Sequence, residues 1–105
     1  YGPTECTTFS TAQQAISIFP SSLNKRIGIG TGQGLCAWLV NPSDHTKLVP
    51  LGCVGEVLLE GPLVAAGYLE DEEKTTAAFF HDPPWLLEGC QHHAGRHGRL
   101  YKTGD

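Results

Sequence analysis

Glycine and proline recur along the whole chain and limit the length of any helix or strand that it can form. The 105 residues include 13 glycines and 7 prolines. Proline removes a backbone donor and fixes one dihedral angle, and glycine weakens the interior of helices and strands. We therefore predict one loop-rich domain, or a piece of one, with short elements, many turns and a single modest core.

The segments between these turns have the patterns of short strands and one helix. Four runs are predicted to be strands: residues 35–40, 47–49, 56–60 and 99–102. The first is continuously apolar, which predicts a strand buried on both faces with Trp38 in the core. The acidic run 70–73 favours the start of a helix that continues to Phe80, and the Asp-Pro-Pro run 82–84 stops it. The predicted fold is mainly β with one short helix (α+β), in a meander that curls into a sheet or small barrel.

The first third of the chain has a weaker pattern. Residues 6–15 are rich in Thr and Ser and predict a loop that leads into a short element at 16–19, followed by a polar connection over 20–26. Glycine then recurs at every second position over 28–34. The dinucleotide fingerprint Gly-x-Gly-x-x-Gly fails in both possible registers, because Gln or Leu occupies its last place. We interpret this run as a flexible turn before a strand.

Two polar turns at the ends of the chain carry the groups that a nucleotide site requires. The first is Tyr-Gly-Pro-Thr-Glu at residues 1–5, and the second is Tyr-Lys-Thr-Gly-Asp at residues 101–105. An aromatic ring can lie against a base, a hydroxyl can reach phosphate oxygen, and a carboxylate can hold magnesium. The two turns present these ingredients in nearly the same order, which indicates two halves of one site.

Charge and cysteine usage exclude several classes of partner. The formal net charge is -4 and the seven basic residues are scattered, which argues against a nucleic acid held through its phosphates. No apolar run approaches the length of a membrane span. The four cysteines are widely separated; two disulfides are arithmetically possible, but free thiols in a reducing cytosol are the favoured interpretation. We expect a cytoplasmic protein without a nucleic-acid or membrane partner.

Two further clusters offer alternative sites. One has the atom types that bind zinc: Cys90, His92, His93 and His97. Its spacing matches no structural zinc pattern, so a solvated loop is favoured over a metal site. The other cluster is Glu56 and Glu60, which lie on one face of a predicted strand. They could form a general acid/base pair, although a solvent-facing edge is the commoner meaning.

A central motif supplies the context for the two terminal turns. Residues 55–69 contain Gly-Glu-Val-Leu-Leu-Glu-Gly followed by Leu-Val-Ala-Ala-Gly-Tyr-Leu. With this motif between its end motifs, the chain resembles the adenylate-forming enzymes, and most closely the amino-acid-activating adenylation domains of nonribosomal peptide synthetases. Pro3 favours peptide synthetases over acyl-CoA ligases, and residues 73–86 resemble the fungal branch. Ala66 stands where many members of the family have arginine.

The resemblance implies roles for individual residues. Four would bind the nucleotide: Tyr1 against the adenine ring, Gly2 through close backbone approach, Thr4 at the α-phosphate and Asp105 at both ribose hydroxyls. Thr4 and Glu5 would be the catalytic residues, with Glu5 ligating magnesium. Thr8 and Phe9 fall where the family lines its substrate pocket. The central motif would be mostly framework.

The resemblance also implies a division of the chain and a reaction. Residues 1–25 would end an α/β subdomain, and residues 26–105 would form a distorted, barrel-like β subdomain. With ATP and Mg²⁺, the enzyme would activate an amino acid or related carboxylate and load it on the phosphopantetheine thiol of a carrier domain. The remaining subdomains would supply a glycine-rich phosphate loop and a lysine, so we expect no adenylation by these 105 residues alone. An acyl-CoA or aryl-CoA ligase and a noncatalytic β-rich binding module remain alternatives.

Overall fold

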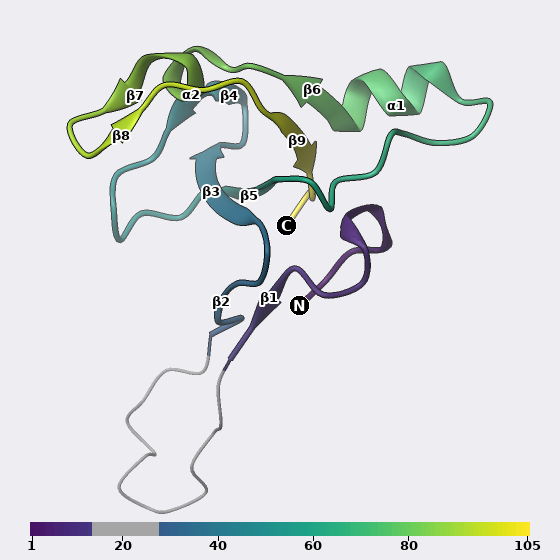
Figure 1. The fold of residues 1–105 in the computed structure, drawn as a ribbon, viewed down its shortest axis with the longest axis horizontal. Coiled ribbons are helices and arrows are strands. Elements are labelled where there is room, and N and C mark those ends of the chain that lie inside the picture. Colours follow the sequence, from purple (N-terminus) through teal and green to yellow (C-terminus); the bar gives the residue numbers. More distant parts are fainter. Residues whose placement is uncertain (14–27) are drawn as a thin grey trace, which may run out of the picture.

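A curled antiparallel sheet forms the body of the protein. The computed structural model describes residues 1–13 and 28–105. Its main sheet has the strand order β4-β3-β5-β9-β6, with every neighbouring pair antiparallel (Figure 1). These strands are β3 (Cys36–Asn41), β4 (Asp44–Leu48), β5 (Glu56–Glu60), β6 (Phe79–His81) and β9 (Arg99–Lys102). The prediction of a mainly β fold with a short helix is confirmed.

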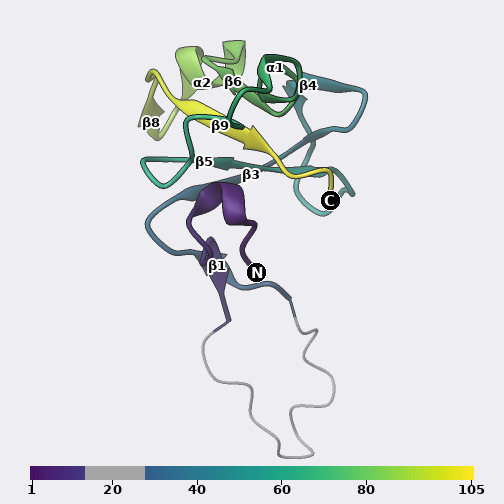
Figure 2. The ribbon, with the colours of Figure 1, turned by 90° about the vertical axis from the view of Figure 1, so that its right-hand side faces the viewer.

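Small elements surround this sheet. They are the 3-10 turn η1 (Thr4–Cys6), the strands β1 (Thr11–Ala12), β2 (Thr31–Gly32), β7 (Gly89–Cys90) and β8 (His93–Ala94), and the helices α1 (Glu72–Ala78) and α2 (Pro84–Glu88). β1 pairs with β2, and β7 pairs with β8. Figure 2 shows the segment with η1 and β1 on one side of the main sheet and α1 and α2 on the other. The N-terminal segment therefore lies against one face of the sheet.

The core formed by the described residues consists of two clusters, one on each face of β5. Successive strand residues point to opposite faces, so the fully buried neighbours Leu58 and Leu59 enter different clusters. The first cluster contains Cys6, Leu59, Val64, Phe79 and Tyr101, and the second contains Val40, Leu58, Leu86 and Leu100. Because Cys6 belongs to the first cluster, apolar packing joins the N-terminal segment to the sheet.

The strand predicted at 35–40 forms, but the prediction that it is buried on both faces is wrong. In β3 only Val40 is buried, Trp38 is half-buried, and Leu39 is 43% exposed. The first cluster covers the sheet at β5, β9 and β6 and leaves Leu39 uncovered. Trp38 packs at the border of the second cluster, with its ring centroid 4.9 Å from that of Trp85.

The other predicted elements within the described residues form in the structure and differ from the prediction mainly at their ends. The strands at 56–60 and 99–102 have the predicted bounds, whereas the strand predicted at 47–49 begins at Asp44. The helix predicted to reach Phe80 ends at Ala78, because Phe79 and Phe80 pair with β9 instead. The proline run that follows is predicted only to end the helix, yet Pro84 begins α2. Proline is tolerated at the first position of a helix, because a backbone N–H there would have no partner within the helix.

The glycine run at 28–34 contains more than the predicted turn. Thr31 and Gly32 form β2, which pairs with β1. Gly30 has φ +87°, and a Cβ there would lie 2.0 Å from the Ala12 carbonyl oxygen, so only glycine fits. The predicted element at 16–19, the connection at 20–26 and the boundary between residues 25 and 26 lie outside the described residues.

Candidate functional site

The two terminal motifs meet in space. The Tyr1 hydroxyl donates a hydrogen bond to Asp105 Oδ2 at 2.5 Å, across 104 residues of sequence. Burial and the neighbouring Asp105 carboxylate both raise the pKa of the Tyr1 hydroxyl, which agrees with its being the donor in this bond. The two ends of the described structure therefore lie side by side (Figure 1).

The first motif forms a closed loop. The Tyr1 carbonyl accepts hydrogen bonds from the backbone N–H groups of Ser10 and Thr11, at 3.1 and 2.9 Å. Gly2 lies so close to this closure that a Cβ there would meet the Thr8 carbonyl oxygen at 1.8 Å. Glycine at position 2 is thus required by the loop itself, in addition to any approach of a nucleotide. Thr8 has φ +69°, another sign of a tightly wound backbone.

The second motif is fastened to strand β5. Thr103 Oγ1 donates to the Val57 carbonyl at 2.7 Å, and the Val57 N–H donates to the Asp105 carbonyl at 2.9 Å. The Gly104 N–H donates to Glu56 Oε1 at 3.1 Å. These bonds attach the backbone of residues 103–105 to β5, so the position of the Asp105 carboxylate depends on that strand.

Glu56 is therefore a site residue whose role the sequence did not reveal. Its predicted position on a solvent-facing edge is wrong: Glu56 is 8% exposed, because β5 is an inner strand between β3 and β9. Its second oxygen faces Lys102 Nζ at 3.7 Å. The sequence contains one hint of this role: Glu56 begins a predicted strand, and the terminal motif could lie beside the start of that strand.

Replacing Glu56 by alanine is expected to release the Gly104 amide. A hydrogen bond to a charged acceptor contributes about 1.5–3 kcal/mol, so this amide should exchange its hydrogen ~10-fold faster or more. Amide hydrogen exchange in the intact parent protein would measure the change. Glu56→Gln is the matched control, since it retains an acceptor oxygen and should cause a smaller increase. Unchanged protection of Gly104 in Glu56→Ala would contradict the anchoring role.

Glu5, the predicted magnesium ligand, has its own hydrogen-bonded surroundings. Tyr68 Oη donates to Glu5 Oε1 at 2.8 Å, across 63 residues of sequence. The backbone N–H of Glu5 and the Tyr68 hydroxyl lower the pKa of the carboxyl group, and the carboxylate in turn raises the pKa of Tyr68. Both directions describe an ionised Glu5. A single ionised carboxylate fits magnesium, which keeps several waters and takes only one or two protein carboxylates beside substrate phosphates.

The remaining predicted residues are exposed to solvent. Thr4 lies in η1 directly before Glu5, and its side chain is exposed. Thr8 is exposed as well, and Phe9 is 73% exposed. The described residues therefore do not enclose Phe9 as a pocket wall, and its predicted role in substrate binding stays a prediction.

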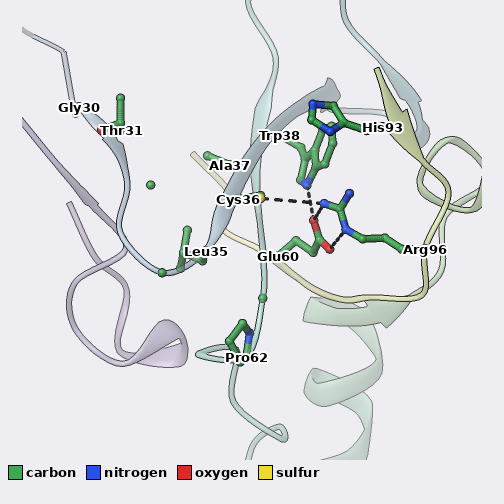
Figure 3. A pocket seen from close by; sticks show the side chains of 13 residues that line it. Gly30, Thr31, Leu35, Cys36, Ala37, Trp38, Glu60, Pro62, His93 and Arg96 are labelled. Carbon is green, nitrogen blue, oxygen red and sulfur yellow. Dashed lines mark hydrogen bonds and ion pairs between the residues drawn. The ribbon is translucent and has the colours of Figure 1, made fainter. Parts of the chain in front are cut away.

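Glu60 is held in a separate charged cluster. Arg96 Nε and Nη2 donate to its two carboxylate oxygens at 2.9 and 2.6 Å, and Trp38 Nε1 donates to Oε2 at 2.9 Å (Figure 3). Glu60 is only 6% exposed, so its predicted place on a solvent-facing edge is also wrong. The cluster borders an open hollow of about 930 Å³, between residues 30–38 and the chain around Arg96. Because Glu56 and Glu60 bond to different partners, the structure does not bring them together as an acid/base pair.

The cysteine and histidine residues do not gather around a common point. Cys90, His92, His93 and His97 are all exposed, and His97 Nδ1 lies 2.9 Å from Asp82 Oδ2. Within residues 1–13 and 28–105, no three His, Cys, Asp or Glu side chains form a group that could hold a metal ion. All four cysteines are free thiols, and burial raises the pKa of Cys6 to about 11.

Comparison with known proteins connects the chain to one class of enzyme. Its relatives, at 49–56% identity over all 105 residues, are nonribosomal peptide synthetases from fungi. Among them are peramine synthetase ppzA of Metarhizium majus at 56% identity, nonribosomal peptide synthetase sidD of Aspergillus fumigatus at 52% and nonribosomal peptide synthetase 1 of Ajellomyces capsulatus at 49%. The chain spans 4%, 5% and 6% of the length of these relatives, respectively. No family model matches the sequence.

The helices of the described part of the chain are short. None of those found in residues 1–13 and 28–105 has both the length and the apolar character that crossing a membrane requires.

Proposed function

We propose that this chain is part of an adenylation domain of a fungal nonribosomal peptide synthetase. Such a domain activates an amino acid or related carboxylate with ATP as an acyl-adenylate, and then loads it on the phosphopantetheine thiol of a carrier domain. The observation that carries the proposal is the contact of Tyr1 with Asp105, which unites two motifs from opposite ends of the chain. The fungal peptide synthetases that match the whole chain support it.

In the proposed reaction, a carboxylate oxygen of the substrate attacks the α-phosphorus of ATP and pyrophosphate departs. Tyr1 and Asp105 bind the nucleoside: the ring lies against adenine, and the Asp105 carboxylate accepts the ribose hydroxyls in place of the Tyr1 hydroxyl. Holding the nucleoside in one orientation aligns the α-phosphate for attack, which is a large part of catalysis in phosphoryl chemistry. The bonds from Val57 and Glu56 keep the Asp105 loop in place for this task.

The charge that develops on the phosphate oxygens is the second requirement of this reaction. Thr4 would contact the α-phosphate through its hydroxyl, and Glu5 would hold magnesium through its ionised carboxylate. Magnesium, when bound, offsets negative charge on phosphate oxygens as a Lewis acid. Glu5 suits this role because it is ionised near neutral pH, and its own N–H and the Tyr68 hydroxyl lower the pKa of its carboxyl group further.

The test is a substrate panel with the intact parent protein. We expect ATP–pyrophosphate exchange that depends on one or a few amino acids or related carboxylates, followed by transfer of the acyl group to a carrier domain. Transfer to free coenzyme A instead would identify an acyl-CoA or aryl-CoA ligase. No exchange with any carboxylate, in a protein that is folded and carries its carrier domain, would contradict the proposed function and favour a noncatalytic binding module.

A further inference from the structure

We infer that Tyr68 is a positioning residue for the adenylation reaction, which it serves by fixing the orientation of the Glu5 carboxylate. This inference rests on the proposed function, because that function makes Glu5 the magnesium ligand. The observation behind it is the 2.8 Å hydrogen bond from Tyr68 Oη to Glu5 Oε1. Carboxylates that ligate metals are commonly oriented by hydrogen bonds from a second residue, and loss of that residue weakens metal binding.

The backbone of Tyr68 is itself fixed by helix α1. The Tyr68 N–H donates to Thr75 Oγ1 at 2.9 Å, and Thr75 Oγ1 donates to the Asp71 carbonyl at 2.7 Å. Gly67, directly before the tyrosine, has φ +142°, and a Cβ there would lie 2.5 Å from Thr75 Cγ2. Only glycine permits this close approach, so the Gly-Tyr pair of the central motif and the first turn of α1 form one unit.

The ring of Tyr68 is held by aromatic packing. It meets Phe79 edge to face, with centroids 5.5 Å apart and an interplanar angle of 69°. Phe79 in turn packs on Tyr101, at 5.1 Å between centroids. This packing supports the ring in the orientation in which its hydroxyl donates to Glu5.

The same segment also holds the backbone of Glu5. The Ala65 N–H donates to the Glu5 carbonyl at 2.8 Å. Residues 65–68 therefore contact Glu5 twice, once at its main chain and once at its carboxylate. This double attachment gives the end of the central motif a part in the reaction, because it sets where the metal ligand of the first motif points.

Tyr68→Phe in the intact parent protein tests the inference, because it removes the hydroxyl and retains the ring packing on Phe79. Binding of Mn²⁺ is measured by electron paramagnetic resonance in the presence of α,β-methylene-ATP. The affinity for Mn²⁺ is expected to fall ~10-fold, the lower end of the loss typical for residues that orient metal ligands. Thr76→Ala is the matched control and should leave Mn²⁺ binding unchanged. It removes a hydroxyl from the same helix, and among the described residues this hydroxyl has its one hydrogen bond with the Glu72 carbonyl.

Glu5→Gln and the double variant separate the possible outcomes. If Tyr68 acts through Glu5, Tyr68→Phe should cause no further loss of Mn²⁺ affinity in the Glu5→Gln protein. If Glu5→Gln lowers the affinity for Mn²⁺ but Tyr68→Phe does not, the role of Tyr68 is refuted and the proposed function is unaffected. If Tyr68→Phe lowers the affinity for Mn²⁺ equally in the wild-type and the Glu5→Gln proteins, the hydroxyl does not act through Glu5. Unchanged binding in Glu5→Gln would instead refute the magnesium role of Glu5, and the inference with it.

Discussion

Replacing Glu5 by alanine in the intact parent protein should lower the rate of ATP–pyrophosphate exchange by ~10²–10³-fold. A metal ion contributes several kcal/mol of charge stabilisation in the transition state, and each 1.36 kcal/mol is a factor of ten in rate. Glu5 is the ionised carboxylate through which the first motif would hold that ion, and its surroundings offer it a fixed geometry. The exchange assay, run at saturating ATP and substrate, measures the loss.

Two further variants make this result specific. Glu73→Ala removes an exposed carboxylate on α1 and should leave the exchange rate unchanged. Asp105→Ala removes the proposed ribose acceptor, so it should raise the ATP concentration needed for half-maximal exchange. Unchanged exchange in both Glu5→Ala and Asp105→Ala would overturn the assignment of the site to the two terminal motifs.

The strands that the sequence predicted best are those with clear ends. β5 lies between Gly55 and Gly61, and its bounds match the prediction. β3 differs by a single residue at each end from the predicted run, which Gly34 and Pro42 enclose. Glycine and proline end strands for local steric reasons, and local rules can be applied to sequence alone. The end of α1 had no such marker, and pairing with β9 decided the conformation of Phe79.

Burial of the two glutamates could not be predicted, because it depends on strand order. A strand with charged residues at both ends has the pattern of a sheet edge, yet β5 is an inner strand of the sheet. The partners that make the buried charges tolerable are distant in sequence: Arg96 is 36 residues from Glu60, and Gly104 is 48 residues from Glu56. Buried carboxylates need such partners, and nothing local in the sequence identifies them.

The candidate site likewise contains residues with a signal in the sequence and residues whose contacts depend on the fold. Tyr1 and Asp105 belong to similar turns at the two ends, and that similarity was enough to predict that they lie close together. Tyr68 had no such signal, because a tyrosine in an apolar motif has the pattern of a framework residue. The hydrogen bond from which we infer its role forms because the sheet and α1 bring its hydroxyl to Glu5.

Leu59→Ala is expected to lower the free energy of unfolding of the domain by ~2–5 kcal/mol, the usual cost of a buried leucine truncated to alanine. Leu59 is fully buried, and its cluster joins the sheet to Cys6, the residue after Glu5. The cavity would therefore loosen the segment that carries the first motif as well as the sheet. Urea unfolding of the intact parent protein, followed by a probe in this domain, measures the stability.

Leu58→Ala provides the matched comparison, because Leu58 is equally buried but faces the other cluster, which lacks Cys6. Both variants should lose similar stability, yet only Leu59→Ala should speed hydrogen exchange at the backbone amides of Ser10 and Thr11, which close the first loop on Tyr1. Equal exchange at these amides in the two variants would show that the loop is held independently of the core. In that case the hydrogen bonds of Tyr1 and Glu5, rather than apolar packing through Cys6, would fix the site on the sheet.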